Sequence, residues 1–274
     1  MNRLTTTFNH LKQQRRRALV GYLTAGDPDF EASLAILRDT VDAGLDVLEL
    51  GVPFSDPTAD GPVIQEASAR ALKSGMTLAR VLDLARQVRS GSDVPIVLFS
   101  YYNPLLHYGL DRLVTDAAAA GVDGFLVVDL PPEETGELRA AIGERDLPLI
   151  RLVAPTTSPG RLRMLTQDAG GFLYLITRTG VTGTGGLECE TVRDHATAVK
   201  TLTSLPVCLG FGISTAADVR RLAGLADGLV IGSALVRIVA EHAADGTAAD
   251  RVSSKVRELR NALDSALAQQ PLNT

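Results

Sequence analysis

The chain has 274 residues, of which 45% are hydrophobic and 22% charged, and its formal net charge is −5. A chain of this size can bury a substantial core, and its mild acidity argues against nucleic acid or an anionic membrane as a partner. Its two cysteines show no metal-ligand spacing, and no apolar run resembles a signal peptide or a membrane span. We therefore expect a cytoplasmic protein without disulfides.

Short apolar runs alternate with amphipathic stretches along the chain. In chain order the pattern predicts helix 3–15, strand 18–24, helix 30–44, strand 46–50, strand 95–100, helix 109–121, strand 124–129, helix 132–146, strand 148–153, helix 158–170, strand 171–177, strand 206–210, helix 215–226, strand 227–232 and helix 249–268.

Strands that alternate with helices favour parallel pairing through right-handed crossovers. Eight such strands within about 230 residues fit a closed α/β barrel better than an open doubly wound sheet. Two helix-to-strand joints share the pattern Ala-Gly-x-Asp, at 43–46 and 120–123, which is typical of a turn with glycine at the helix end. We predict a single (β/α)8 (TIM) barrel domain over 1–274, with an extra N-terminal helix and a short phosphate-binding helix after the eighth strand.

Glu49 stands between two leucines near the end of the second predicted strand. Because side chains alternate along a strand, Leu48 and Leu50 can pack on the helices while Glu49 points into the barrel mouth. A carboxyl group without water around it has a raised pKa, as a general acid near neutral pH requires. The alternative is a structural glutamate paired with a barrel arginine.

The stretch PFSDPTADGP (53–62) follows the second strand and contains three prolines and a glycine. This composition predicts an irregular loop over the barrel mouth. Asp60 is a candidate catalytic residue, because a loop acid facing a buried acid allows two proton transfers from different environments. Turn formation alone also explains Asp56 and Asp60, so both interpretations stay open.

Glycine-rich stretches end the last three strands: RTGVTGTGG (178–186), GFGIS (210–214) and IGSALV (231–236). Backbone amides in such turns and at a helix N-terminus bind anions, and barrels of this type commonly bind phosphate there. We expect a phosphate ester at this position, with Ser233 capping the short helix. No lysine ends a predicted strand, the histidines form no metal-ligand pattern, and no dinucleotide fingerprint is present.

Seven motifs make the sequence resemble the tryptophan synthase alpha subunit family over about residues 15–240. In order they are LELGVPFSDPTADGPVIQ, YYNPLLHYG, GVDGFLVVDLPPEE, VAPTT, RTGVTG, GFGIS and DGLVIGSA. The resemblance implies retro-aldol cleavage of indole-3-glycerol phosphate to indole and glyceraldehyde 3-phosphate.

The resemblance also implies roles for individual residues. Glu49 would move protons at indole C3 and at the glycerol hydroxyl, and Asp60 would accept a hydrogen bond from the indole N–H. The phosphate would be held by Gly183, Gly212, Gly232 and Ser233. The indole would be lined by Tyr22, Phe99, Tyr174 and Phe211. Thr182 would bond Asp60 on lid closure, and we expect the glycine-rich loop 182–188 to order over the substrate.

A beta subunit is the implied partner, in an alpha2beta2 heterotetramer, and it would contact Pro53, Asp56 and Pro57. The resemblance implies no cofactor in this chain and pyridoxal phosphate only in the partner. Two alternatives are a stand-alone lyase that releases free indole and an alpha-like module that mainly activates a beta-type partner. The presence of both acids argues against the activator.

Overall fold

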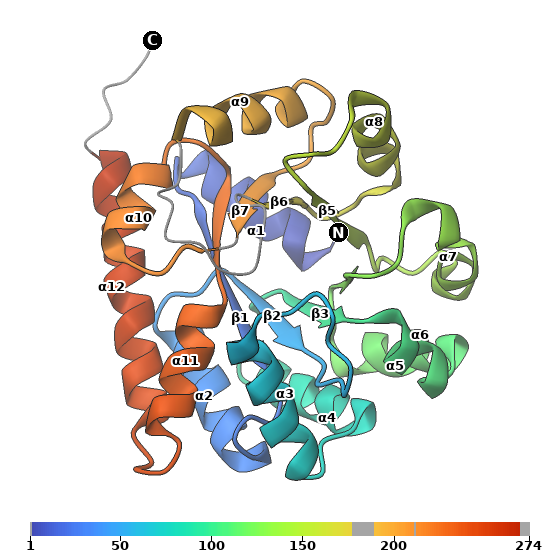
Figure 1. Cartoon of the computed structure of the whole chain (residues 1–274), viewed down its shortest axis with the longest axis vertical. Coiled ribbons are helices and arrows are strands. Elements are labelled where there is room, and N and C mark those ends of the chain that lie inside the picture. Colours follow the sequence, from blue (N-terminus) through green and yellow to red (C-terminus); the bar gives the residue numbers. More distant parts are fainter. Residues whose placement is uncertain (1, 177–188, 211, 269–274) are drawn as a thin grey trace.

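Eight short parallel strands pair side by side and close into a barrel, in the computed structural model that describes residues 2–176, 189–210 and 212–268 (Figure 1). The sheet order follows the chain from β1 to β8, and β1 pairs with both β2 and β8. The predicted (β/α)8 barrel is therefore confirmed. The strands are β1 Ala18–Thr24, β2 Val47–Gly51, β3 Ile96–Ser100, β4 Gly124–Val127, β5 Leu149–Val153, β6 Leu173–Ile176, β7 Val207–Gly210 and β8 Gly228–Ile231.

Helices surround the strands and also close one end of the barrel (Figure 1). They are α1 Arg3–Gln13, α2 Phe30–Asp42, α3 Pro62–Lys73, α4 Leu78–Arg89, α5 Tyr102–Tyr108, α6 Leu110–Ala120, the 3-10 helix η1 Pro132–Glu134, α7 Gly136–Ile142, α8 Pro159–Asp168, α9 Cys189–Lys200, α10 Ala216–Leu222, α11 Ser233–His242 and α12 Ala248–Ala268. The long α12 packs against α2, α10 and α11, which brings the two ends of the barrel sequence together.

Two helices end well before their predicted limits. The helix predicted at 132–146 is a 3-10 turn followed by α7, which stops at Ile142 because Gly143 has a φ of 57°. The helix predicted at 215–226 ends at Leu222, although Thr215 caps its start in a reciprocal capping box with Asp218. Strands β3, β4, β5, β7 and β8 are also one or two residues shorter than predicted, β6 starts at Leu173 and not at 171, and β2 is shifted by one residue from the predicted 46–50. At the start of β7, for example, the Val207 N–H donates to an aspartate side chain.

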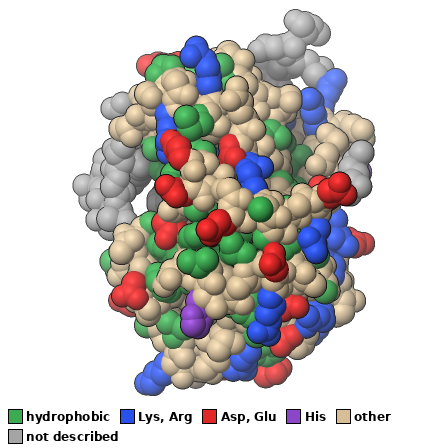
Figure 2. Space-filling view, turned by 90° about the vertical axis from the view of Figure 1, so that its right-hand side faces the viewer, with side chains coloured by type: hydrophobic (Ala, Val, Ile, Leu, Met, Phe, Trp, Pro, Cys, Tyr) green, Lys and Arg blue, Asp and Glu red, His purple; other side chains and the backbone are tan. Residues whose placement is uncertain are grey.

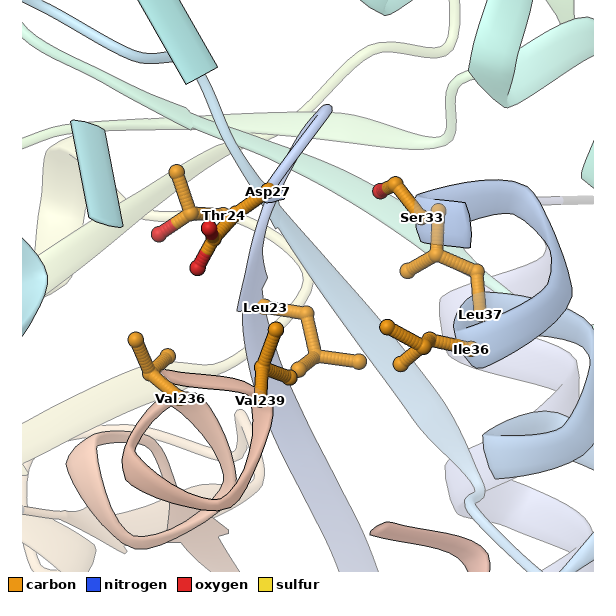
Figure 3. A pocket seen from close by; sticks show the side chains of 8 residues that line it. All are labelled: Leu23, Thr24, Asp27, Ser33, Ile36, Leu37, Val236 and Val239. Carbon is orange, nitrogen blue, oxygen red and sulfur yellow. The ribbon is translucent and has the colours of Figure 1, made fainter. Parts of the chain in front are cut away.

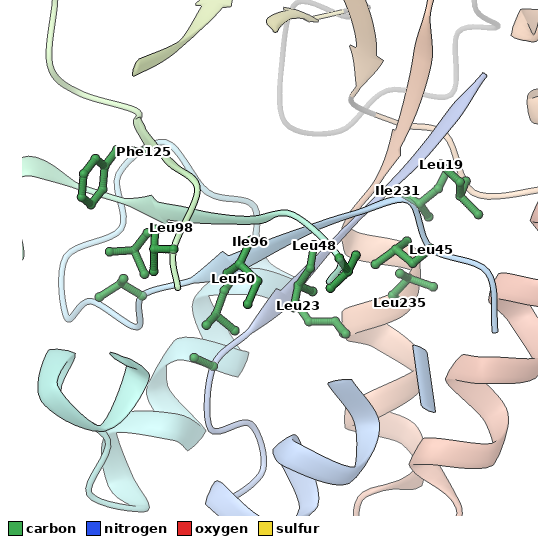
Figure 4. Packing of buried hydrophobic residues seen from close by; sticks show 14 of the residues in the cluster. Leu19, Leu23, Leu45, Leu48, Leu50, Ile96, Leu98, Phe125, Ile231 and Leu235 are labelled. Atoms are coloured by element: carbon green, nitrogen blue, oxygen red, sulfur yellow. The ribbon is translucent and has the colours of Figure 1, made fainter. Parts of the chain in front are cut away.

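Alternate residues of each strand face the barrel interior and the surrounding helices. On β2, Val47 belongs to the inner cluster, whereas Leu48 and Leu50 pack in the outer layer with α2 and α4 residues. Figure 4 shows this outer layer around Leu48, Ile96 and Leu98. The predicted orientation of Glu49 toward the interior is therefore confirmed.

Helix α1 closes the N-terminal end of the barrel. Its side chains Leu4, Phe8 and Leu11 are buried in the inner cluster, and the Phe8 ring lies 5.7 Å from that of Phe172. This packing excludes water from the N-terminal end of the barrel interior. The interior therefore opens toward the carboxyl ends of the strands.

Three aspartates hold neighbouring strands together at the N-terminal end of the barrel. Each accepts a backbone N–H near the start of the preceding strand at 2.8 to 2.9 Å: Asp46 from Leu19, Asp123 from Ile96 and Asp227 from Val207. Two of them end the Ala-Gly-x-Asp joints, whose glycines have φ values of 106° and 79°. The joints thus form the predicted glycine turns and also satisfy strand donors that have no ladder partner.

A small internal cavity of about 10 Å³ lies between β1, α2 and α11, next to Thr24, Asp27 and Ser33 (Figure 3). Its volume corresponds to about one water molecule. In the described residues, no helix has the length and apolar character needed to cross a membrane.

We predict that Asp46→Ala lowers the free energy of unfolding by about 2 kcal/mol. The substitution leaves the Leu19 N–H without its acceptor and removes one of the two carboxylates that pair with the buried Arg260, the other being Asp264. Urea unfolding of the purified variants measures this loss. Asp42→Ala is the matched control, since Asp42 is exposed at the end of α2, and it should change the value by no more than about 0.5 kcal/mol. Equal effects of the two substitutions would contradict the role of Asp46.

Candidate active site

Glu49 occupies the middle of β2, between Tyr22 on β1 and Val97 on β3 in the strand register. Its side chain is 0% exposed. Neither carboxyl oxygen has a hydrogen-bond partner among the described residues, and no described arginine pairs with it. The arrangement contradicts the alternative of a glutamate held by a barrel arginine.

Burial governs the charge of this carboxyl group. Loss of hydration disfavours the carboxylate and raises the pKa of Glu49 from its ordinary value of 4.5 to about 8. Glu49 therefore carries a proton at neutral pH, and apolar and aromatic side chains surround it in the interior. A neutral carboxyl group in this position can donate a proton and take one back.

Asp60 lies on the irregular connection 52–61, which the sequence predicted as a loop. Bonds within the loop fix its final turn, where the Asp60 N–H donates to the Pro57 carbonyl at 3.1 Å. Gln65 of α3 donates to the Asp60 carbonyl at 2.8 Å. These bonds fix the Asp60 backbone just before the start of α3, and the residue is only partly buried.

Asp60 has a different electrostatic environment from Glu49. Burial raises the pKa of Asp60 from its ordinary value of 3.8 to about 6, while a hydrogen bond from Tyr101 opposes this rise. The Tyr101 hydroxyl donates to Asp60 Oδ2 at 3.1 Å. Asp60 is therefore mainly ionised at pH 7, when Glu49 is mainly protonated.

Aromatic side chains surround the two acids. Tyr22 and Phe99 meet edge to face with ring centroids 5.0 Å apart. The charges of Asp60 and Glu49 both raise the pKa of the Tyr22 hydroxyl, which places Tyr22 near both groups. Tyr174 is buried in the inner cluster, and the charge of Glu49 raises its pKa as well. The structure thus brings three of the predicted indole-lining residues together around Glu49.

The N-terminus of α11 approaches this cluster. A Cβ atom at Gly232 would lie 3.6 Å from the Tyr22 Cβ, so the turn after β8 is next to the aromatic residues. The prediction that Ser233 caps the helix is wrong: Gly232 is the N-cap, and Ser233 is the first helical residue. Ser233 still contributes a first-turn N–H, which has no acceptor within a helix. Gly212 is exposed in the turn after β7 with a φ of 79°.

A cavity of about 760 Å³ opens beside Asp60 and Phe99. Val127, Leu152 and Ile176, at the carboxyl ends of β4, β5 and β6, form its apolar wall. A space of this size and lining suits a small aromatic ligand. The remaining predicted site residues, Thr182, Gly183 and Phe211, and the loop 182–188 lie outside the described residues.

The three predicted interface residues differ in exposure. Pro53 is buried, Asp56 is exposed and Pro57 is intermediate. Figure 2 shows the side of the molecule that carries α5 to α8, where acidic and basic side chains are intermixed and hydrophobic ones gather near the middle. Within the described residues, no three histidine, cysteine, aspartate or glutamate side chains are arranged to hold a metal ion.

Two contacts at the site were not predicted from the sequence. Tyr101 bonds Asp60 across 41 residues, and Arg70 of α3 makes two 2.8 Å bonds to the buried Asp27 in the loop after β1. The second pair ties α3, and with it the Asp60 loop, to β1. The sequence signals for Tyr101 were its place directly after a predicted strand, at the active end of the barrel, and its position as the first residue of the motif YYNPLLHYG.

A closed parallel barrel with two unlike carboxyl groups at its open end is typical of (β/α)8-barrel enzymes that use acid–base chemistry. Residues 8–264 match the family model described as tryptophan synthase alpha chain. The chain therefore belongs to the tryptophan synthase alpha chain family.

Individual relatives agree with this assignment. The tryptophan synthase alpha chain of Desulfosudis oleivorans is 50% identical over 262 residues, which cover 96% of this chain and 99% of that relative. That of Desulfatibacillum aliphaticivorans is 51% identical over 242 residues, covering 88% and 91%. The crystal structure of tryptophan synthase subunit alpha from Legionella pneumophila str. Paris aligns with a TM-score of 0.89 at 36% identity, covering 97% of this chain and 99% of that one.

We predict that the free energy of unfolding of Glu49→Gln, relative to that of the wild type, increases as pH rises from 5 to 8. In this window the folded chain keeps the Glu49 proton while the unfolded chain has lost it, so the unfolding free energy of the wild type falls with pH. Glutamine cannot ionise and removes this fall, which amounts to the order of a few kcal/mol. Urea unfolding of both proteins at several pH values tests it; a difference that stays constant with pH would contradict the raised pKa.

Proposed function

We propose that Glu49 and Asp60 are the catalytic residues for cleavage of indole-3-glycerol phosphate to indole and glyceraldehyde 3-phosphate. The observation that carries this proposal is the contrast between the two acids. Glu49 is fully buried, unpaired among the described residues and protonated near pH 7, whereas Asp60 is partly exposed, hydrogen-bonded and mainly ionised. A reaction with one proton donor and one anionic partner needs this pair of states.

As a member of the tryptophan synthase alpha chain family, the chain is a lyase of tryptophan biosynthesis. The relatives carry the name of the alpha chain, and this does not favour either a stand-alone indole producer or a module that mainly activates its partner. A stand-alone lyase would use the same catalytic residues.

The proposed mechanism has two proton transfers at Glu49. The protonated carboxyl group donates to indole C3, and the positive charge that forms on the ring nitrogen is stabilised by the Asp60 carboxylate. The Glu49 carboxylate then takes the proton from the hydroxyl on the carbon attached to C3. The bond between that carbon and C3 breaks, its electron pair returns to the ring, and the carbonyl of glyceraldehyde 3-phosphate forms. Glu49 ends protonated, ready for another cycle.

This sequence of steps explains why burial matters. A carboxyl group with a pKa near 8 is protonated at the start and still takes a proton back in the second step. Asp60 has to be ionised throughout, which its pKa of about 6 permits at neutral pH. The rate should therefore be highest between about pH 6 and pH 8.

The substrate would bind across the barrel mouth. Tyr22, Phe99 and Tyr174 would line the indole, and the N–H groups at Gly212, Gly232 and Ser233 would hold the phosphate, as the position of the α11 N-terminus beside Tyr22 supports. Gly183 and Phe211 would complete these two sets, and Thr182 would bond Asp60 as the loop 182–188 closes.

The proposal extends to a beta-type partner. This partner subunit would carry pyridoxal phosphate, whereas this chain would need no cofactor. The chain would act as a single barrel domain in the cytoplasm. Asp56 and Pro57 would contact the partner directly, while the buried Pro53 would shape the loop from beneath. Because Asp60 belongs to the same loop, binding there would bias the loop toward its active position.

We predict that a beta subunit from a close relative raises the turnover of indole-3-glycerol phosphate several-fold by ordering the Asp60 loop. Turnover is measured with and without that subunit. Asp56→Lys should reduce the stimulation and leave the basal rate within about two-fold, because Asp56 is exposed and, among the described residues, its carboxylate accepts a hydrogen bond only from Ser55. An unchanged rate on adding the partner would support the stand-alone alternative.

We predict that Glu49→Gln lowers kcat by roughly 10²–10⁴-fold, the usual loss on removing a general acid–base group. The measurement is indole release from indole-3-glycerol phosphate by the purified variant. Glu144→Gln is the matched control, since Glu144 is exposed in the loop after α7, and it should retain the wild-type rate. If Glu49→Gln turns over within a few-fold of wild type, Glu49 is not catalytic.

A further inference from the structure

The hydroxyl of Tyr101 lies between two neighbouring residues of the Asp60 loop. It accepts a hydrogen bond from the Ala59 N–H at 2.8 Å and donates to Asp60 Oδ2 at 3.1 Å. The direction is fixed, because an N–H can only donate and the single phenolic proton is then free for the carboxylate. Tyr101 thus contacts both the backbone and the functional group of this part of the loop.

Tyr101 is itself held by rigid parts of the barrel. It directly follows β3 and is the N-cap residue of α5, and its carbonyl accepts from the Ser100 hydroxyl at 2.8 Å. Its ring lies 5.3 Å from that of Phe54, at the start of the same loop. Only 4% of the residue is exposed. A side chain fixed in this way can set the position of a group on an irregular loop.

Only one oxygen of the Asp60 carboxylate is used by this contact. Within residues 2–176, 189–210 and 212–268, Oδ1 has no hydrogen-bond partner. A carboxylate bonded through Oδ2 keeps its plane fixed and leaves Oδ1 available for a ligand N–H.

We propose that Tyr101 is a positioning residue, which holds Asp60 through Oδ2 so that Oδ1 meets the ring N–H of the substrate. The inference rests on the proposed function, in which Asp60 is the anionic partner of the indole nitrogen. Tyr101, which lies between β3 and α5, would thus orient Asp60 on the loop after β2.

The same bond acts on the charge of Asp60. A donor to the carboxylate favours its ionised form, so the Tyr101 hydroxyl holds the pKa of Asp60 below the value that burial alone would give. Other charged or titratable groups at this position come from several elements around the cavity, and they are Tyr22, Glu49, Asp129, Arg151 and Arg161. Removing the Tyr101 hydroxyl leaves all of these in place.

The test is Tyr101→Phe, which keeps the ring and removes only the hydroxyl. We expect kcat/KM at pH 7 to fall roughly 10- to 100-fold, in line with the loss of a hydrogen bond to a charged group. The acid limb of the pH profile should move to higher pH, so the loss should be larger at pH 6 than at pH 8. In an Asp60→Asn background the same substitution should cost less than about three-fold, because the carboxylate that it orients is already absent.

Tyr102→Phe is the matched control. Tyr102 is the next residue in the chain, and its hydroxyl donates to Glu137 of α7 at 3.5 Å. This variant should keep kcat/KM within about two-fold of wild type and leave the acid limb unmoved. A Tyr101→Phe variant that loses activity equally at every pH, and to the same extent in the Asp60→Asn background as in wild type, would show only a structural support of the loop and overturn the proposal.

A second measurement separates this inference from the proposed function. The Asp60 carboxyl group is titrated by 13C NMR in wild type and in Tyr101→Phe, which requires no substrate. A higher pKa in the variant supports the hydrogen bond even if the wild type fails to cleave indole-3-glycerol phosphate, a failure that would count against the function alone. An unchanged pKa overturns the role of Tyr101 whatever the activity.

Discussion

The site depends on one unusual condition, a carboxyl group placed in the closed interior of the barrel without a partner for its charge. Glu49 stays protonated when it is buried, because no described group would compensate the charge of a carboxylate there. The condition holds only while the interior stays dry. Water is excluded by the inner cluster and by the aromatic side chains beside Glu49. The α1 residues exclude it at the N-terminal end of the barrel.

Asp60 complements Glu49 because it is held in a different way. It belongs to a loop, reaches solvent and receives a hydrogen bond from Tyr101, so its charge survives at neutral pH. The loop is in turn tied to its surroundings by Gln65 and by the Arg70–Asp27 pair behind α3. A strand therefore supplies the neutral acid, and the loop that directly follows this strand supplies the anion.

Much of this could be predicted from the sequence, because the deciding forces are local or periodic. Alternation along β2 was enough to direct Glu49 inward, and proline content was enough to identify the Asp60 loop. Contacts between residues far apart in the sequence could not be predicted from local patterns. Tyr101 bonds Asp60 across 41 residues, and Asp46 bonds Arg260 across 214. The early end of α7 and the cap of α11 depend on the backbone angles of Gly143 and Gly232, which the residue type permits but does not fix.

The most direct test is the titration of the Glu49 carboxyl group itself by 13C NMR in the folded protein without substrate. Glu49→Gln identifies its resonance. Burial without a partner predicts a midpoint near pH 8, well above that of Asp60. A midpoint near the ordinary value of 4.5 would mean that Glu49 is hydrated or paired, and that it could not act as the neutral acid at pH 7.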